Sequence, residues 1–196
     1  MPRLYIVRDP SPNAFATGRD QNHASIAVTV GLLHMMDREE LEGVLAHEIS
    51  HIQNKDILIM SVVIILASIF SYMANVVTNV SISNNRSNNN NFLFALASVT
   101  ASILLPIAMI IIRASISRKR EYIADASAAI LTDNRKGLAR ALKKIGAFNM
   151  PLQNANNAIA HLYISNPFGS IDRQSFWQKL FMTHPLIDDR IKLLLD

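Results

Sequence analysis

Two long segments without a charged side chain constrain this chain more than any other feature. Residues 57–77 and 92–112 each contain 21 residues and no Asp, Glu, Lys or Arg. Because an α-helix rises 1.5 Å per residue, each segment would span roughly 31 Å, about the thickness of the hydrocarbon core of a bilayer. We therefore expect a transmembrane hairpin over residues 57–112, closed by a polar, Asn-rich loop at 83–91. The alternative is a pair of buried core helices, which the lack of an amphipathic stripe disfavours.

The basic residues near this hairpin lie mainly outside it. The loop contains one, Arg86, whereas the outer flanks contain Lys55, Arg113, Arg118, Lys119 and Arg120. Cytoplasmic flanks of membrane helices are enriched in Lys and Arg, so this distribution predicts that both flanking polar segments lie in the cytoplasm. The alternative is that the basic cluster serves the folded protein rather than its topology.

The polar segments predict strands followed by helices. Short β-branched runs at 4–8 and 25–30 indicate strands, and the NAFAT stretch between them indicates a third, edge strand. Asp37 followed by Glu40 is typical of a helix N-terminus with a capping box, and this helix would continue to about Lys55. Further helices are expected around 118–131, around 135–148 and after Pro185.

The predicted fold class is therefore α+β, with one polar domain interrupted by the hairpin. Residues 1–56 would form its N-terminal part, with the strands and the first long helix. Residues 113–196 would form its C-terminal part, on the same side of the membrane. The two parts would meet there.

A His-Glu-x-x-His pattern lies in the first long helix. His47 and His51 are four residues apart and project from one face of a helix, where two neutral imidazoles can bind one Zn²⁺. Glu48 lies beside them as a candidate general base. The chain contains no cysteine, so thiolate ligands are excluded. The alternative is a helix with two surface histidines, which their position in the middle of an amphipathic helix argues against.

Glu121 is the candidate third ligand, because it is the only glutamate beyond this helix. Asp125 follows four residues later on the same helix face. It would accept a hydrogen bond from the second nitrogen of a ligating imidazole, which fixes the tautomer of that ring. The alternative places Glu121 on a solvated face, paired with Arg118 or Lys119.

These motifs together resemble a known family. HEISH followed by EYIAD resembles the HEXXH…EXXXD zinc peptidases, and more narrowly the HtpX-like membrane zinc metalloproteases. NAFATG at 13–18, the polar residues Asn54 and Asp56 after HEISH, and the HP…R pattern of FMTHPLIDDRI are similar to motifs of that family. The resemblance covers nearly the whole chain. Members usually begin with another pair of membrane helices and a linker, which are absent here, so we expect Met1 to be an internal point of a longer protein.

The resemblance implies a mainly helical, zincin-like metalloprotease domain with a small N-terminal sheet. His47, His51 and Glu121 would hold one Zn²⁺ per chain. Glu48 would accept a proton from water and pass it to the leaving amine during peptide-bond hydrolysis.

The resemblance also implies roles for residues outside the metal motif. Asn13, Ala14 and Phe15 would hold the substrate as an added strand, although a merely packed edge is the alternative. His184 and Arg190 would stabilise the oxyanion or brace the site. Arg190 is equally placed in sequence to form a salt bridge with Asp188 or Asp189.

The implied function is cleavage of unfolded or damaged membrane proteins at the cytoplasmic surface of the inner (plasma) membrane, in quality control and stress response. Expected partners are these substrates, the lipid bilayer and other membrane quality-control proteases. The net charge of +4 is mild, and we expect no nucleic-acid partner. If the HEISH helix continues through Asp56, the metal would lie roughly 9 Å before the first lipid-embedded residue.

Three other functions fit parts of the pattern. A prenyl-protein peptidase shares the motifs but has a much larger helical chamber. An intramembrane site-2 type protease would carry HEXXH in an apolar helix, which the charges around His47 argue against. A catalytically silent membrane adaptor with a vestigial metal site is the alternative from a different class.

Overall fold

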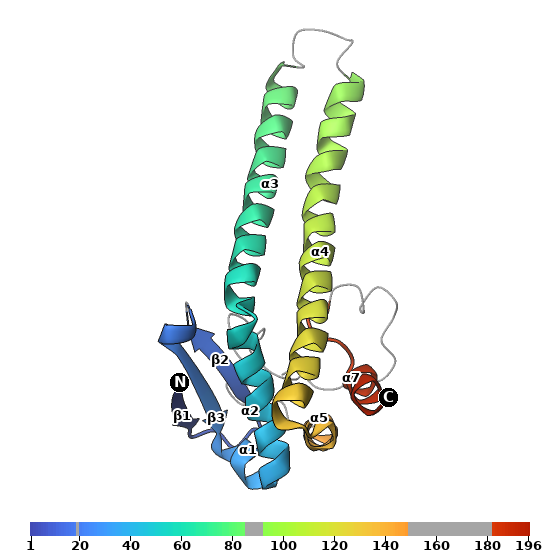
Figure 1. The fold of residues 1–196 in the computed structure, drawn as a ribbon. Helices are drawn as coiled ribbons and strands as arrows, with labels where there is room; N and C mark the ends of the chain where they lie inside the picture. The colour runs from blue at the N-terminus through green and yellow to red at the C-terminus, as the bar shows by residue number, and fades with distance from the viewer. Residues whose placement is uncertain (19, 85–91, 149–181) are drawn as a thin grey trace.

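The structure is a computed structural model that describes residues 1–18, 20–84, 92–148 and 182–196. Two long helices, α3 (Asp56–Asn84) and α4 (Phe92–Thr132), lie side by side and rise from a smaller base (Figure 1). The base holds the sheet, the shorter helices and both chain termini. The molecule therefore has a helical hairpin on a mixed α and β base, in agreement with the predicted fold class.

A three-stranded sheet forms one side of the base. Its order is β1-β3-β2, with β1 (Arg3–Val7) parallel to β3 (Ala24–Thr29) and β2 (Ala14–Gly18) antiparallel to β3. The two strands expected at 4–8 and 25–30 are present, each beginning one residue earlier. The NAFAT stretch forms the edge strand β2, as predicted.

The helix that carries the histidines begins where the sequence predicts. A short helix, α1 (Val30–Met35), follows β3 directly and precedes α2 (Arg38–Gln53). Asp37 caps α2: its side chain accepts a hydrogen bond from the Glu40 backbone N–H, and the Glu40 carboxylate accepts one from the Asp37 N–H, both at 2.9 Å. This capping box is confirmed.

The end of α2 differs from the expectation. The chain leaves the helix at Asn54 and Lys55, where Lys55 adopts a positive φ of 56°, and α3 begins anew at Asp56. A left-handed residue interrupts an α-helix, so α2 and α3 are separate helices. The expected continuous helix through Asp56 is wrong, and so is the 9 Å spacing that depended on it. The first residues of α3 lie beside the end of α2 instead.

The second long helix also differs from the expectation. The helices predicted at 92–112 and 118–131 are one continuous helix, α4, of 41 residues. The residues that join them, Arg113–Ser117, contain no Gly or Pro that would end a helix. The last turns of α4 are therefore a rigid continuation of the long apolar segment.

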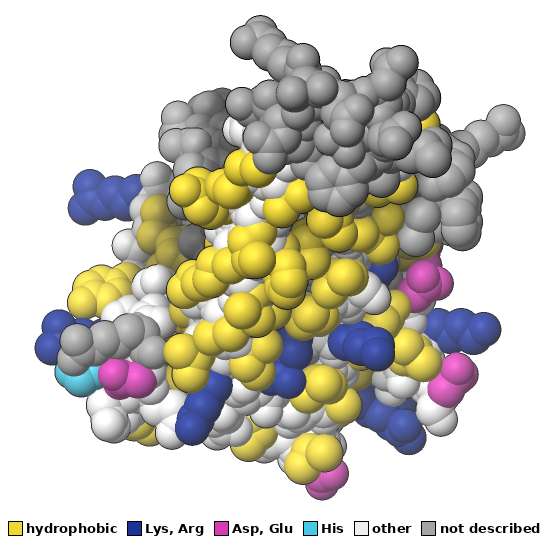
Figure 2. Space-filling model, turned by 90° about the horizontal axis from the view of Figure 1, so that it is seen from above, with side chains coloured by type: hydrophobic (Ala, Val, Ile, Leu, Met, Phe, Trp, Pro, Cys, Tyr) yellow, Lys and Arg dark blue, Asp and Glu magenta, His cyan; other side chains and the backbone are white. Residues whose placement is uncertain are grey.

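Both long helices are apolar enough to cross a membrane. The candidate spans are Asp56–Val80 and Val99–Thr132, and only 6% of the most apolar window of each is buried within the molecule. Seen from above, apolar side chains cover this part of the surface and Lys and Arg side chains lie around it (Figure 2). The predicted loop at 83–91 lies almost wholly outside the described residues.

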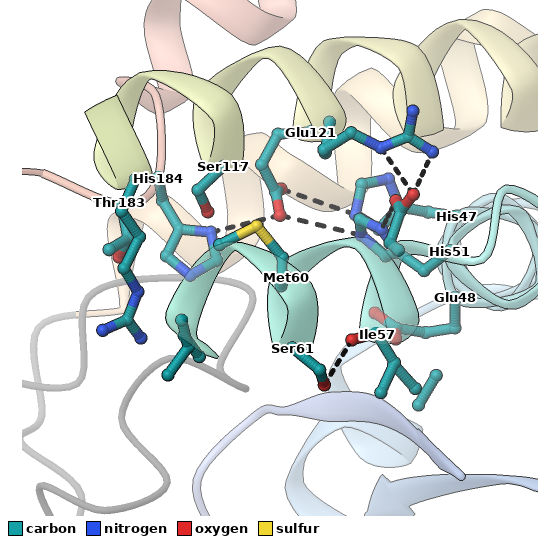
Figure 3. Close-up of a pocket in the computed structure, with 15 residues that line it drawn as sticks. His47, Glu48, His51, Ile57, Met60, Ser61, Ser117, Glu121, Thr183 and His184 are labelled. Carbon is teal, nitrogen blue, oxygen red and sulfur yellow. Dashed lines mark hydrogen bonds and ion pairs between the residues drawn. The ribbon is translucent and has the colours of Figure 1, made fainter. Parts of the chain in front are cut away.

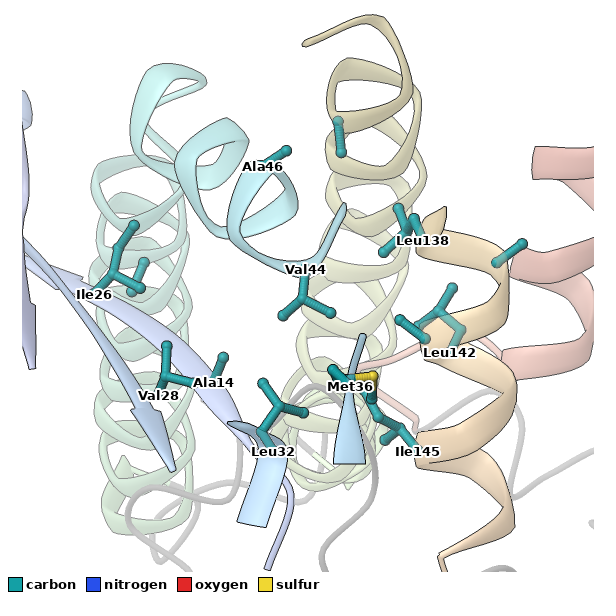
Figure 4. Close-up of a cluster of buried hydrophobic side chains, with 14 of the residues drawn as sticks. Ala14, Ile26, Val28, Leu32, Met36, Val44, Ala46, Leu138, Leu142 and Ile145 are labelled. Carbon is teal, nitrogen blue, oxygen red and sulfur yellow. The ribbon is translucent and has the colours of Figure 1, made fainter. Parts of the chain in front are cut away.

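The core of the base joins both halves of the chain. Buried side chains from the sheet, α1, α2 and α5 (Arg135–Ala147) gather in one cluster, to which the C-terminal helix α7 (Ile187–Leu195) adds Leu194 (Figure 4). α2 and α5 approach closely at Gly43, where an added Cβ would lie 2.7 Å from the Leu138 backbone nitrogen. This packing holds α2 in place against the elements that follow the hairpin.

Candidate metal centre

Three side chains that are distant in the sequence converge where α2 crosses α4. One nitrogen each of His47 and His51 and one oxygen of Glu121 lie within 4.8 Å of one another. Each histidine Nε2 lies 3.6 Å from a Glu121 oxygen, and the two Nε2 atoms are 3.0 Å apart. Figure 3 shows Glu121 reaching from α4 toward both imidazoles. Two nitrogens and one oxygen at such separations can hold a divalent cation.

The second nitrogen of each imidazole faces a carboxylate. His47 Nδ1 lies 2.9 Å from Asp125 Oδ1, one turn after Glu121 on α4. His51 Nδ1 lies 2.7 Å from Asp56 Oδ2, at the first residue of α3. A carboxylate at Nδ1 favours the tautomer that leaves the Nε2 lone pair free for a cation. The orientation of both rings is thus compatible with metal binding through Nε2.

A buried arginine from the C-terminal helix completes the cluster. Arg190 is only 1% exposed and donates two hydrogen bonds to Asp125, at 2.7 and 2.8 Å. Its Nη1 atom lies 3.2 Å from Glu121 Oε2. An arginine between two buried carboxylates offsets their mutual repulsion and fixes their positions.

These contacts decide two of the alternatives left open by the sequence. Glu121 is 6% exposed, so it does not lie on a solvated face with Arg118 or Lys119. Arg190 points to Asp125 and Glu121, not to its exposed neighbours Asp188 and Asp189. Arg190 therefore sits where a bracing residue would.

Glu48 follows His47 directly on α2 and is 4% exposed. Burial raises the pKa of its carboxyl above the ordinary value, although His47 and His51 act in the opposite direction. Its carboxylate also accepts a hydrogen bond from the backbone of Ala16 on β2. A buried glutamate with a raised pKa suits a group that both accepts and returns a proton.

A cavity of about 210 Å³ opens beside the cluster. Its walls include the three ligand side chains, Glu48 and His184, together with apolar residues of α3. His184 Nδ1 lies 3.3 Å from Glu121 Oε1, and neither ring nitrogen has a hydrogen-bond partner of good geometry among the described residues. The cavity wall thus includes an imidazole that lies beside the Glu121 carboxylate.

The residues expected to bind the substrate lie less directly on this cavity. Asn13, Ala14 and Phe15 are not among its lining residues, whereas Ala16 of the same strand is. The Asn13 backbone is engaged inside the sheet: its carbonyl accepts from the Thr29 N–H at 2.9 Å, and its N–H donates to Thr29 Oγ1 at 2.8 Å. Ala14 is fully buried.

Two residues of the site had no assigned role in the sequence analysis. Asp56 accepts from His51 and also from Arg120, which donates a further hydrogen bond, of 3.0 Å, to the Asn54 carbonyl. The signal available in the sequence was an aspartate five residues after the second histidine. Its role depends on the break between α2 and α3, which a continuous helix would not allow.

Known proteins are similar to this chain over nearly its whole length. A model of Peptidase family M48 matches residues 2–196. The chain is 47% identical over 200 residues to a "Protease HtpX homolog" of Caldanaerobacter subterraneus subsp. tengcongensis, covering 98% of this chain and 65% of that protein. It is also 47% identical over 201 residues to that of Ligilactobacillus salivarius, covering 99% and 66%. The chain thus spans about two thirds of the length of these relatives.

A solved structure shares the fold. The crystal structure of S. mikatae Ste24p matches with a TM-score of 0.62 at 21% identity, covering 98% of this chain and 44% of that one. At this identity the similarity concerns the fold alone. The arrangement of base and long helices is thus one that also occurs within a much longer chain.

Replacing Asp56 by asparagine is expected to weaken metal binding about 10- to 100-fold, because the His51 ring loses the carboxylate that orients it. Apparent affinity is measured by competition with a chromophoric chelator. Asp188→Asn, which changes an exposed carboxylate on α7, is the matched control and should leave the affinity unchanged. Equal affinity of both variants and the parent protein would show that Asp56 does not position the ligand.

Metal binding is expected to release a proton from His47. Burial opposes its charged form, but Asp125 and Glu121 outweigh burial and raise its pKa to about 10, so the metal-free ring is protonated at neutral pH. This proton competes with the metal, so affinity should rise with pH, about tenfold per unit, until the pH approaches that pKa. Calorimetry in buffers of different ionisation enthalpy counts the released protons. An affinity that is constant between about pH 6 and 9 would contradict this assignment.

Proposed function

This chain belongs to peptidase family M48, and we propose that it is the catalytic part of a membrane-bound zinc endopeptidase. One observation carries the proposal: the ligand atoms of His47, His51 and Glu121 converge beside the buried carboxylate of Glu48. Two imidazoles and one carboxylate form a common catalytic zinc site, which keeps a fourth position for water or substrate. The buried Glu121 Oε2, with no hydrogen-bond partner among the described residues, fits a ligand.

The chemistry follows from the residues around that position. Zinc, when bound, supplies a Lewis acid that polarises the scissile carbonyl. Glu48 accepts a proton from the water that attacks the carbonyl carbon, and returns it to the amine nitrogen as the carbon–nitrogen bond breaks. His184, which lines the cavity, would donate a hydrogen bond to the carbonyl oxygen as it becomes negative. Arg190 and Asp125 hold Glu121 and His47 in place during these steps.

The substrate would bind along the free edge of β2. In an antiparallel ladder the hydrogen-bonded pairs alternate, so with Asn13 bonded to Thr29 the main chain at Ala14 and Ala16 points away from β3. Ala16 reaches the cavity and the carboxylate of Glu48, whereas Ala14 is fully buried. We therefore expect the substrate backbone to pair mainly with Ala16. This position is closer to the C-terminal end of β2 than the residues first expected to bind the substrate, Asn13, Ala14 and Phe15.

The position of the cavity supports membrane proteins as substrates. Its walls include Ile57, Met60 and Ile64, at the start of a helix that is apolar enough to cross a membrane. Backbone pairing with an added strand tolerates many sequences, as a protease for misfolded or damaged proteins requires. We propose that such proteins are cleaved at the cytoplasmic surface of the inner membrane, in quality control and stress response.

The test of this chemistry compares Glu48→Gln with the parent protein. The variant should retain zinc, measured by metal analysis, while hydrolysis of labelled casein falls by about 10²- to 10⁴-fold because the proton acceptor is lost. Glu42→Gln, an exposed glutamate on the same helix, is the matched control and should keep full activity. Zinc-loaded Glu48→Gln with undiminished activity would refute the assigned base. A parent protein with neither zinc nor activity would favour the adaptor function.

The orientation is tested with single cysteines, since the chain contains none of its own. A cysteine at position 88, between the two apolar helices, should react with a membrane-impermeant maleimide added to intact cells. One at position 136, in the base, should react only after the membrane is opened, because the basic flanks stay in the cytoplasm. Labelling of position 136 alone in intact cells would reverse the proposed topology.

A further inference from the structure

The cavity beside the metal cluster continues along the furrow between α3 and α4. Its α3 wall consists of Ile57, Met60, Ser61 and Ile64. Its α4 wall includes Arg113, Ser117 and Glu121, which recur every four residues and so share one helix face. Because the two helices run in opposite directions (Figure 1), Ile64 and Arg113 mark the end of the furrow that is farther from the metal ligands.

The length of this furrow can be related to a peptide. Arg113 and Glu121 are eight residues apart on one helix, which corresponds to about 12 Å along its axis. An extended peptide advances about 3.3 Å per residue. A group of the substrate that meets Arg113 would therefore lie three or four residues from a bond held at the metal ligands.

Arg113 differs from the other arginines near the site. Arg120 donates to Asp56 and Asn54, and Arg190 to Asp125. The Nε atom of Arg113 is shielded from solvent and has no hydrogen-bond partner among the described residues, and no ion pair of its guanidinium is found there. A partly shielded guanidinium without a direct ion pair is unfavourable, and a carboxylate that binds it through two oxygens would offset this cost.

We propose that Arg113 is an anion-binding subsite that selects peptides with an acidic group three or four residues from the cleaved bond. The acidic group is an Asp or Glu side chain or a terminal carboxylate, and apolar residues between it and the bond face Ile57, Met60 and Ile64. A lipid phosphate would approach from the outer surface of the hairpin, whereas Arg113 lines the same cavity as the metal ligands. The inference rests on the proposed peptidase function and names its substrate class.

The test uses the full chain in nanodiscs with a set of apolar peptides, in which one Asp is moved from two to six residues on either side of the cleaved bond. Each has a partner peptide with Asn at that position, and the readout is the ratio of kcat/KM within each pair. The ratio should reach about tenfold at three or four residues on one side, as expected for a charged hydrogen bond. A ratio of one at every position in the parent protein would overturn the proposal.

Variants of Arg113 test whether this residue causes the preference for the Asp peptide. Arg113→Met should bring the ratio to about one, and Arg113→Glu should reverse the preference in favour of a peptide with Lys at the same position. Lys119→Met removes an exposed charge from the same helix and should leave the ratio unchanged. A ratio that persists in Arg113→Met, or that is lost equally in Lys119→Met, would overturn the assignment.

A binding measurement separates this inference from the proposed function. Fluorescence anisotropy of labelled Asp and Asn peptides is measured with Glu48→Gln, and with Glu48→Gln combined with Arg113→Met, so no turnover is needed. Tighter binding of the Asp peptide that depends on Arg113 supports the subsite even if the protein cleaves neither peptide. The proposal would be refuted if both peptides bind equally and Arg113→Met changes peptide binding only in nanodiscs of anionic lipid. That result would assign the arginine to lipid phosphate.

Discussion

The contact between α2 and α4 is the interaction on which the rest of the site depends. It brings two imidazoles and a carboxylate from opposite ends of the hairpin to one point, where all three are largely shielded from water. Four carboxylates meet there, those of Glu48, Asp56, Glu121 and Asp125, and each is at most 6% exposed. Arg120 and Arg190 offset part of this charge. With all four ionised, two negative charges remain, which a bound dication would balance and a single proton would not.

Four elements of the base, α2, α5, β2 and α7, each contribute a constraint at or beside that contact. The capping box fixes the start of α2, and its close approach to α5 at Gly43 holds the helix against the C-terminal half. β2 touches Glu48 through the Ala16 backbone. α7 inserts Arg190 between Asp125 and Glu121. The two halves of the base are therefore joined by packing and by buried charge, although the hairpin separates them in sequence.

The sequence predicted the features that depend on local pattern. The spacing of His47 and His51, the capping box at Asp37 and the two uncharged segments follow from the period of a helix and from charge alone. The edge strand β2 followed from its position between two β-branched runs. What the sequence did not reveal depends on tertiary contacts. The turn at Lys55 lies between Asn54, whose carbonyl accepts from Arg120, and Asp56, which both Arg120 and His51 contact. Arg190 has its partners on α4 rather than on its own helix α7. Neither the contacts around Lys55 nor those of Arg190 produce a periodic pattern in the sequence.

If the apolar parts of α3 and α4 cross a membrane, the continuity of α4 sets the distance between that membrane and the proposed active site. Ile112 ends the uncharged segment and Glu121 follows nine residues later in the same unbroken helix, so the ligand lies roughly 13 Å from the end of the apolar span. An extended chain covers this distance in about four residues. A substrate anchored in the same bilayer, as proposed, would reach the site with a short unfolded stretch. A folded loop of that length could not adopt the extended form that the proposed pairing with β2 requires. Under the proposed function, this distance would favour substrates that have lost local structure close to the membrane, and the acidic group proposed to bind Arg113 would add a preference among them.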